Sequence, residues 1–135
     1  APAGTVDLFT DLVQPFLKAP HPDFRIQEMT IYNLDDELEQ DDEVTKAYNK
    51  SLLYLVSRAF EEETPEKILG MEKYSKTVER RILPRLTIHY APSPRVTMSE
   101  THGGFDNDLK TMNHVLKRVC GGDPRKPFTE ESLDY

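Results

Sequence analysis

Apolar residues recur at helical spacing in several stretches of the chain and alternate with polar residues in one. The clearest helix is predicted over residues 105–119, where apolar side chains fall three or four positions apart. This stripe consists of Phe105, Leu109, Met112, Leu116 and Val119. The boundaries agree, because residues 106–108 carry oxygens that can cap a helix start, and Gly121 and Gly122 suit a helix end.

Two further amphipathic helices are predicted upstream. Residues 6–17 repeat with helical spacing behind Thr5, a predicted N-cap, and Pro15 is expected to kink this segment. Residues 44–60 give the longest predicted helix, of about four to five turns. Its predicted stripe consists of Val44, Ala47, Tyr48, Leu52, Leu55, Val56, Ala59 and Phe60. Leu53 and Tyr54 lie outside this stripe, which predicts a second covered surface on the same helix.

The remaining segments predict shorter elements. Residues 24–32 show two short alternations out of phase, which favours a strand with a bulge. A Thr-Pro pair starts a predicted helix at residues 64–70, and a further helix is predicted through residues 71–81. Residues 86–90 alternate strictly and predict a strand, and residues 96–98 predict a second short one.

Together these elements predict a helix-rich α+β fold. A length of 135 residues without internal repeats favours a single unit over residues 1–135. Residues 123–135 contain two prolines and predict an extended tail, anchored by Phe128, Leu133 and Tyr135.

The charge pattern excludes some classes of partner. The formal net charge of -7 argues against nucleic acid, whose phosphates an acidic surface repels. Acidic residues gather at 35–43 and 61–63, and we interpret the first run as a solvated face, because it lacks the glycine and terminal glutamate of a calcium loop. Basic residues gather at Arg80, Arg81 and Arg85 and at Arg118, Arg125 and Lys126. These clusters favour a solvated face or a protein-docking surface over a site for lipid headgroups.

Cysteine and hydropathy exclude other kinds of site. Cys120 is the only cysteine, so neither an internal disulfide nor a thiolate metal site is expected, and we interpret it as a small apolar residue of the last helix. No cofactor or metal is predicted. No apolar run reaches membrane-spanning length, and no signal segment is recognised at the N-terminus.

His102 is the one candidate catalytic residue. It lies in a polar loop just before the last predicted helix and precedes Gly103 and Gly104, so little is expected to shield its imidazole. Such a histidine suits a general base, and a structural or exposed loop histidine is the alternative. A catalytic triad also requires a nucleophile and a carboxylate. No G-x-S-x-G segment is present, and Asp106 and Asp108 are interpreted as helix caps.

A wider resemblance rests on residues 74–108, which contain YSKTVERRILPRLTIHYAPSPRV and SETHGGFDND. This region resembles the C-terminal part of type VI secretion lipase effectors of the third class, which belong to the α/β-hydrolase superfamily. In that superfamily the triad runs nucleophile, acid and histidine along the chain, and the histidine precedes the last helix. The resemblance implies that His102 is the catalytic histidine and that this chain is a C-terminal domain or fragment.

The resemblance also implies a biological setting. The chain would be part of an antibacterial phospholipase that hydrolyses an ester bond in phospholipid. It would be inactive alone, because the nucleophile, and with it the triad acid, is expected on a preceding hydrolase segment. Such a protein would be made in the bacterial cytoplasm without a signal peptide and secreted to a rival cell's periplasm. Its partners would be an immunity protein and a secretion adaptor or needle component. The alternative from another class is a non-catalytic, acidic, helical protein-binding module.

Overall fold

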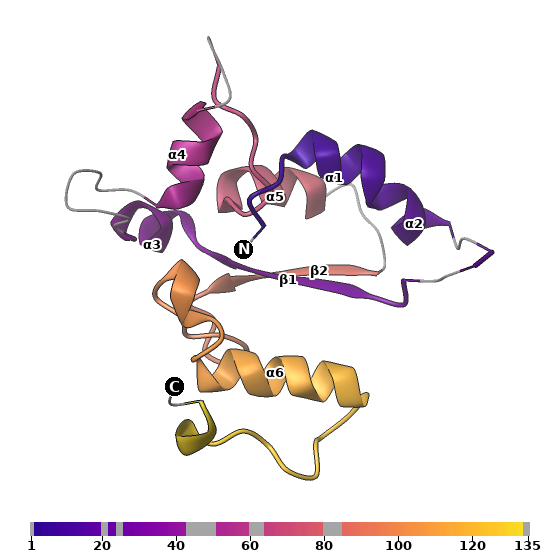
Figure 1. Ribbon diagram of the computed structural model, residues 1–135, viewed down its shortest axis with the longest axis vertical. Coiled ribbons are helices and arrows are strands. Elements are labelled where there is room, and N and C mark those ends of the chain that lie inside the picture. Colours follow the sequence, from indigo (N-terminus) through magenta and orange to yellow (C-terminus); the bar gives the residue numbers. More distant parts are fainter. Residues whose placement is uncertain are drawn as a thin grey trace.

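A two-stranded parallel sheet lies at the centre of the molecule, with helices on both of its faces (Figure 1). The computed structural model describes residues 2–19, 22–23, 26–42, 51–59, 64–79 and 85–133. Strand β1 (Met29–Leu34) pairs with β2 (Leu86–Ala91) in a register that runs from Met29 opposite Leu86 to Leu34 opposite Ala91. The predicted α+β class is therefore confirmed, and so is the predicted strand at residues 86–90.

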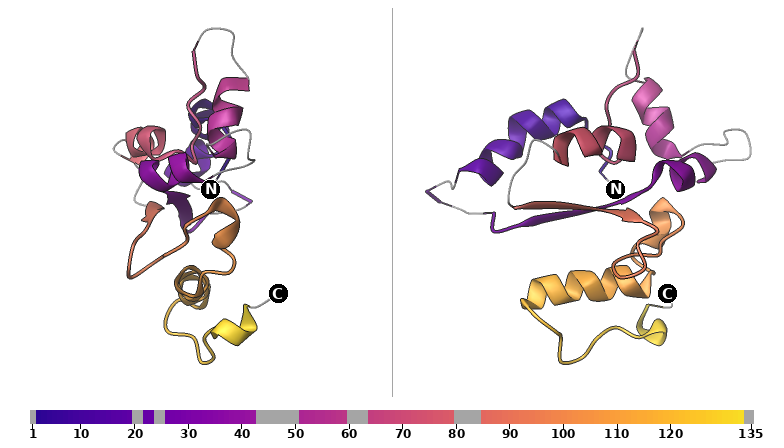
Figure 2. Two further views of the ribbon diagram at one scale, coloured as in Figure 1. Left: turned by 90° about the vertical axis from the view of Figure 1, so that its left-hand side faces the viewer. Right: turned by 180° about the vertical axis from the view of Figure 1, so that it is seen from behind.

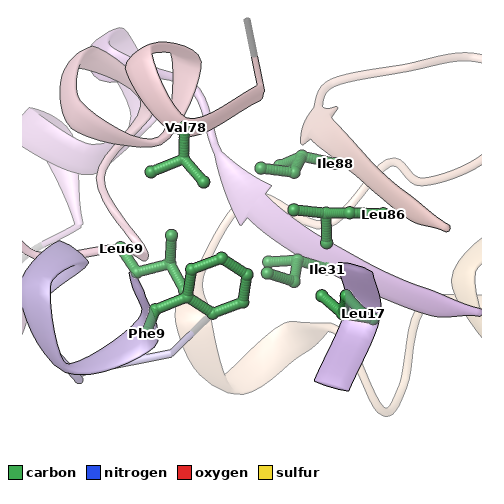
Figure 3. Close-up of a cluster of buried hydrophobic side chains, with 7 residues drawn as sticks. All are labelled: Phe9, Leu17, Ile31, Leu69, Val78, Leu86 and Ile88. Carbon is green, nitrogen blue, oxygen red and sulfur yellow. The ribbon is translucent and has the colours of Figure 1, made fainter. Parts of the chain in front are cut away.

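Helices α1 (Val6–Leu12), α2 (Gln14–Lys18) and α5 (Glu72–Glu79) cover one face of the sheet (Figure 2). The main core forms between these helices and the strands (Figure 3). It consists of Phe9, Leu17, Ile31, Leu69, Val78, Leu86 and Ile88. The alternation of each strand thus places one set of apolar side chains against the helices and frees the other set for the opposite face.

Proline divides the N-terminal helical segment in two. The Thr5 hydroxyl accepts a hydrogen bond from the Leu8 amide at 3.1 Å, which confirms Thr5 as the N-cap of α1. Helix α1 ends at Leu12 with Val13 as its C-cap, and Pro15 occupies the first turn of α2, where a proline needs no amide partner. The expected kink is therefore a break between two short helices.

The acidic segment is more structured than its composition predicts. Strand β1 extends through Leu34, two residues beyond the range predicted for this strand. Helix α3 (Asp36–Asp41) follows at once, and the Asp35 carboxylate caps it by accepting a hydrogen bond from the Leu38 amide at 2.9 Å. The structure describes no strand within the predicted range before Met29, and residues 24 and 25 lie outside the described part.

Helix α4 (Leu52–Ala59) corrects the predicted phase of the long helix. Its buried residues are Leu53 and Ser57, whereas Leu52 and Leu55 of the predicted stripe are exposed. Leu53 packs with Ile68 and Met71 in a second apolar cluster, so the surface outside the predicted stripe is the one that faces the protein. Residues 44–50 and 60 of the predicted helix lie outside the described residues.

The prediction of a helix directly after Thr64 is wrong. Residues 65–67 are irregular, and Ile68 forms an antiparallel bridge with Thr5. The Glu66 amide donates to the Ser57 carbonyl at 2.7 Å, and the Ser57 hydroxyl donates to the Glu66 carbonyl at 2.6 Å, so the segment is tied to α4. Helix α5 begins at Glu72, within the range predicted as 71–81, of which residues 80 and 81 are not described.

Helix α6 (Leu109–Cys120) lies on the other face of the sheet (Figure 1). Asp108 is its N-cap and Gly121 its C-cap, with a φ of 68° in the left-handed region that favours glycine. The predicted stripe is only partly correct, because Thr111 is the buried residue of α6 while Val119 is exposed. Cys120 is exposed too, which corrects its assignment to the apolar side.

The segments flanking α6 are mostly irregular. Residues 96–98 form no strand, and a single bridge joins Ser93 to Thr97 instead. After α6 the tail turns back along the helix and contains the short 3-10 helix η2 (Glu130–Ser132). The Asn113 side chain bonds both backbone groups of Phe128, and Leu133 is buried, so the tail is anchored near two of its predicted residues. Residue 135 lies outside the described part.

Among the described helices, none has both the length and the apolar character that crossing a bilayer requires.

Candidate active site

His102 lies in the 3-10 helix η1 (His102–Gly104) between β2 and α6, where it contacts a carboxylate from a distant part of the chain. Its Nε2 is 2.9 Å from Oε1 and 2.9 Å from Oε2 of Glu39. The His102 side chain is only 22% exposed, so the flanking glycines do not leave the imidazole open as the sequence predicted.

Glu39 is the carboxylate that the sequence analysis did not identify. It belongs to α3, in the acidic run interpreted as a solvated face, yet its side chain is fully buried. A buried carboxylate needs hydrogen-bond donors to offset the loss of water. Two donors are present, the His102 ring and the Ser51 hydroxyl, and both point at the carboxylate oxygens.

Further hydrogen bonds hold the three residues in place. The Ser51 amide donates to the Glu39 carbonyl at 3.2 Å, which fixes the start of α4 against α3. The His102 amide donates to Oδ2 of Asp42 at 3.0 Å, one residue beyond α3. Both the backbone and the ring of His102 are therefore attached to the same acidic segment.

The contact with Glu39 sets the tautomer of His102. Because a carboxylate accepts, Nε2 carries the proton and donates it to Glu39. Nδ1 then holds the lone pair, and within the described part of the chain it makes no hydrogen bond. The pair therefore presents one basic nitrogen next to a buried negative charge, which is the arrangement of a general base with its orienting acid.

The position of the pair follows from the sheet. Parallel strands end at the same edge, and both partners follow strand ends: Glu39 comes five residues after β1, and His102 eleven residues after β2. The Asp35 amide donates to the Ala91 carbonyl at 2.9 Å, which joins the two strand ends. Functional residues of α/β sheets gather at this carboxyl edge.

The loop that carries His102 is braced against the start of α6. Asp108 accepts from the amides of Met98 and Thr111 at 2.8 and 3.0 Å. Burial would raise the pKa of Asp108, but these hydrogen bonds and that of the Thr111 hydroxyl lower it below its usual value. A Cβ atom at Gly104 would lie 2.7 Å from the Ser99 hydroxyl, so a larger residue here would displace the Ser99 side chain. Asp108 thus acts as a cap, as the sequence predicted.

A second histidine pair lies between the sheet and α6. His89 points away from the main core, as predicted, and its ring centroid is 5.0 Å from that of His114. The Tyr32 hydroxyl donates to Nδ1 of His114 at 2.6 Å, so His114 is partly buried and not a simple surface residue. Burial raises the pKa of Tyr32, which keeps its phenol protonated as the donor.

These two histidines make stability depend on pH. Burial is the largest cause that lowers the pKa of both His89 and His114 below their usual value. The neighbouring His114 and then Arg118 add to it for His89, and Arg118 and then Lys117 for His114. The unfolded chain therefore binds protons more readily, and the free energy of unfolding is expected to fall as the pH drops below about 6.5. Urea unfolding at about pH 7.5 and 5.5 measures this, and His114→Gln should have the smaller difference between the two pH values. Equal differences for the two proteins would contradict the assignment.

No group of three or more potential metal-ligating side chains gathers within the described ranges. The oxygens of residues 106–108 form no cage there, because Asp108 is occupied by the helix start and by the loop.

Comparisons with known proteins add no family to this site. A scan against protein-family models found no match for the chain. Searches of curated proteins and of solved structures found no match either. The chemistry of Glu39 and His102 is therefore the ground on which a function is proposed.

Proposed function

We propose that this chain supplies the acid and the histidine of a serine-type ester hydrolase, with the nucleophile on a preceding segment. The observation that carries the proposal is the contact of Glu39 with His102 at the carboxyl edge of two adjacent parallel strands. The order along the chain, acid then histidine then last helix, is that of α/β-hydrolases. This order gives the contact a catalytic interpretation beyond its structural role.

Each residue has one role in the proposed ester hydrolysis. His102 accepts the proton of the serine hydroxyl through Nδ1 while the serine oxygen attacks the ester carbonyl. The imidazolium then returns this proton to the leaving alcohol, and an acyl-enzyme remains. His102 then accepts a proton from a water molecule, which attacks the acyl-enzyme. This step releases the carboxylic acid product, and the serine recovers its proton from His102. Glu39 stabilises the transient imidazolium and fixes its orientation, which is the role of the triad acid.

Two details of the site bear on this assignment. In the usual serine triad the acid contacts Nδ1 and the serine contacts Nε2, whereas Glu39 contacts Nε2. The basic nitrogen available to a nucleophile is therefore Nδ1. Ser51 is not that nucleophile, because its hydroxyl donates to Glu39 on the side of the acid. We assign Ser51 to holding the carboxylate.

The substrate and setting follow from the resemblance of residues 74–108 to type VI secretion lipase effectors. On that ground the substrate is a phospholipid, and the site of action is the periplasm of a rival cell. The partners are the preceding segment, an immunity protein and a secretion adaptor or needle component. The hydrolase domain would then be complete only with the preceding segment.

A binding module without chemistry is the competing function, and one observation favours it. Leu52 and Leu55 on α4 are exposed on the same helix that buries Leu53, and they offer an apolar surface to a partner protein. A binding module does not need a buried carboxylate paired with a histidine, however, because an apolar pair of similar volume is often at least as stable. The hydrolase reading therefore accounts for more of the structure.

The test is an activity comparison. Hydrolysis of a short-chain nitrophenyl ester is measured for this chain alone and for the chain joined to its natural preceding segment. We expect activity only in the longer protein, together with covalent labelling of its serine by a fluorophosphonate. A longer protein that is folded yet neither hydrolyses the ester nor reacts with the probe would leave the binding module as the function.

A further inference from the structure

A groove of about 420 Å³ runs along α6 on the side of the turn that follows β2. This volume is in the range of sites that hold small ligands. Its lining combines apolar surface with cationic side chains, namely Pro94, Leu109, Arg95, Lys110, Lys117 and His114. Lys110, His114 and Lys117 are three or four residues apart and so share one face of α6.

The groove is cationic in a chain that is acidic as a whole. No carboxylate lines it, although the formal net charge of the chain is -7. Arg95 and Lys110 are exposed, and neither has an ion-pair partner in the part of the chain that the structure describes. Residues 109–127 carry five lysines and arginines against one acid, Asp123. Positive potential is therefore concentrated on this side of the molecule.

One carboxylate competes for the groove at its edge. Asp123 lies 2.5 Å from Nζ of Lys117, and both side chains are largely exposed. An exposed ion pair of this kind is weak, so a stronger anion can displace it. The charge of Lys117 also contributes to the lowered pKa of His114, after burial and Arg118, which agrees with a cationic surrounding.

We propose that this groove binds the phosphate of an anionic phospholipid headgroup at a membrane surface. Several cations that converge beside a ring N–H donor suit a phosphate, and the apolar surface of Pro94 and Leu109 suits the glycerol and the first acyl carbons. The choice of a lipid among phosphate compounds rests on the proposed phospholipid substrate. Sequence patterns did not predict this site, because Arg95 lies far from Lys110 and Lys117 along the chain.

The experiment measures binding separately from hydrolysis. The chain joined to its preceding segment is sedimented with two kinds of vesicle. One is made of ether-linked phosphatidylglycerol, which has no acyl ester to cleave, and the other of phosphatidylcholine. We expect binding to the anionic vesicles only, weakened by salt. The groove variant is Arg95→Gln with Lys110→Gln and Lys117→Gln. Each lost charge should weaken binding about fivefold, so the triple variant should lose roughly 100-fold.

The matched control removes the same charge elsewhere. Arg58→Gln with Lys18→Gln and Lys67→Gln lies outside the groove and should bind within about threefold of the unchanged protein. Equal losses in the two triple variants, or no preference for anionic vesicles, would overturn the proposal. So would binding of inorganic phosphate without binding of vesicles.

A substitution that is expected to strengthen vesicle binding tests the groove independently of the triple variant. Asp123→Asn removes the competing carboxylate and should raise affinity for phosphatidylglycerol vesicles about threefold to fivefold at low salt. Unchanged or lower affinity would count against the groove. Ester hydrolysis is assayed in parallel: vesicle binding without esterase activity would reject the proposed function and keep the groove, and activity without vesicle binding would do the reverse.

Discussion

Replacing His102 by alanine in the chain joined to its preceding segment is expected to lower kcat/KM for a short-chain ester by about 10⁴-fold. The reason is that Nδ1 of His102 is the only basic nitrogen assigned to the proton transfer, and no second base in the described site is placed to replace it. The free energy of unfolding should also fall, because Glu39 stays buried with one donor fewer, so activity is compared per folded molecule. Hydrolysis of a nitrophenyl ester and urea unfolding of the same samples measure the two effects.

Glu39→Gln tests the second member of the pair. The glutamine keeps the size of the side chain and an acceptor for Ser51, but it removes the charge that stabilises the imidazolium. We expect a loss of about 10³- to 10⁴-fold in kcat, as for the acid of a serine triad. A purely structural contact would instead leave kcat per folded molecule unchanged.

His89→Gln is the matched control for both variants. It also removes a partly buried histidine, but this residue belongs to β2 and does not line the groove along α6. Its activity should stay within about threefold of the unchanged protein, because it has no role in the proton transfer. Full activity in His102→Ala, or an equal loss in His89→Gln, would contradict the catalytic assignment.

The sequence predicted best those elements whose signals are local. Strict alternation identified β2, and the side chains at Asp108 and Gly121 identified both ends of α6, because capping depends on neighbouring residues alone. The same reasoning failed for α4. There the buried face contains Ser57, whose hydroxyl donates to the Glu66 carbonyl, and an apolar stripe cannot reveal a buried polar residue.

Glu39 shows why the sequence alone could not predict the whole site. His102 was predicted from its loop, but its partner lies 63 positions earlier, in a run of acids that differ little in their local surroundings. Only the tertiary structure buries one of these acids, when the ends of β1 and β2 meet and α3 packs beside the loop. From the sequence alone the acid is therefore expected on a preceding segment, whereas the structure pairs His102 with Glu39 of this chain.

Phe9→Ala is expected to lower the free energy of unfolding by about 3–5 kcal/mol, the largest stability change among these predictions. Phe9 is 4% exposed and packs between α1 and the sheet, in a cluster with Leu69 and Ile31 (Figure 3). Removing the ring leaves a cavity, and the bridge of Thr5 to Ile68 ties the start of α1 to the rest of the chain.

Leu8→Ala is the control that the same helix offers. Leu8 is the neighbouring residue and is 54% exposed, so its truncation should cost no more than about 0.5 kcal/mol. Urea unfolding followed by circular dichroism measures both variants. Because α1 covers the face of the sheet opposite α6, Phe9→Ala should also reduce ester hydrolysis only in proportion to the unfolded fraction. Equal effects of the two substitutions would show that α1 does not pack on the sheet in this way.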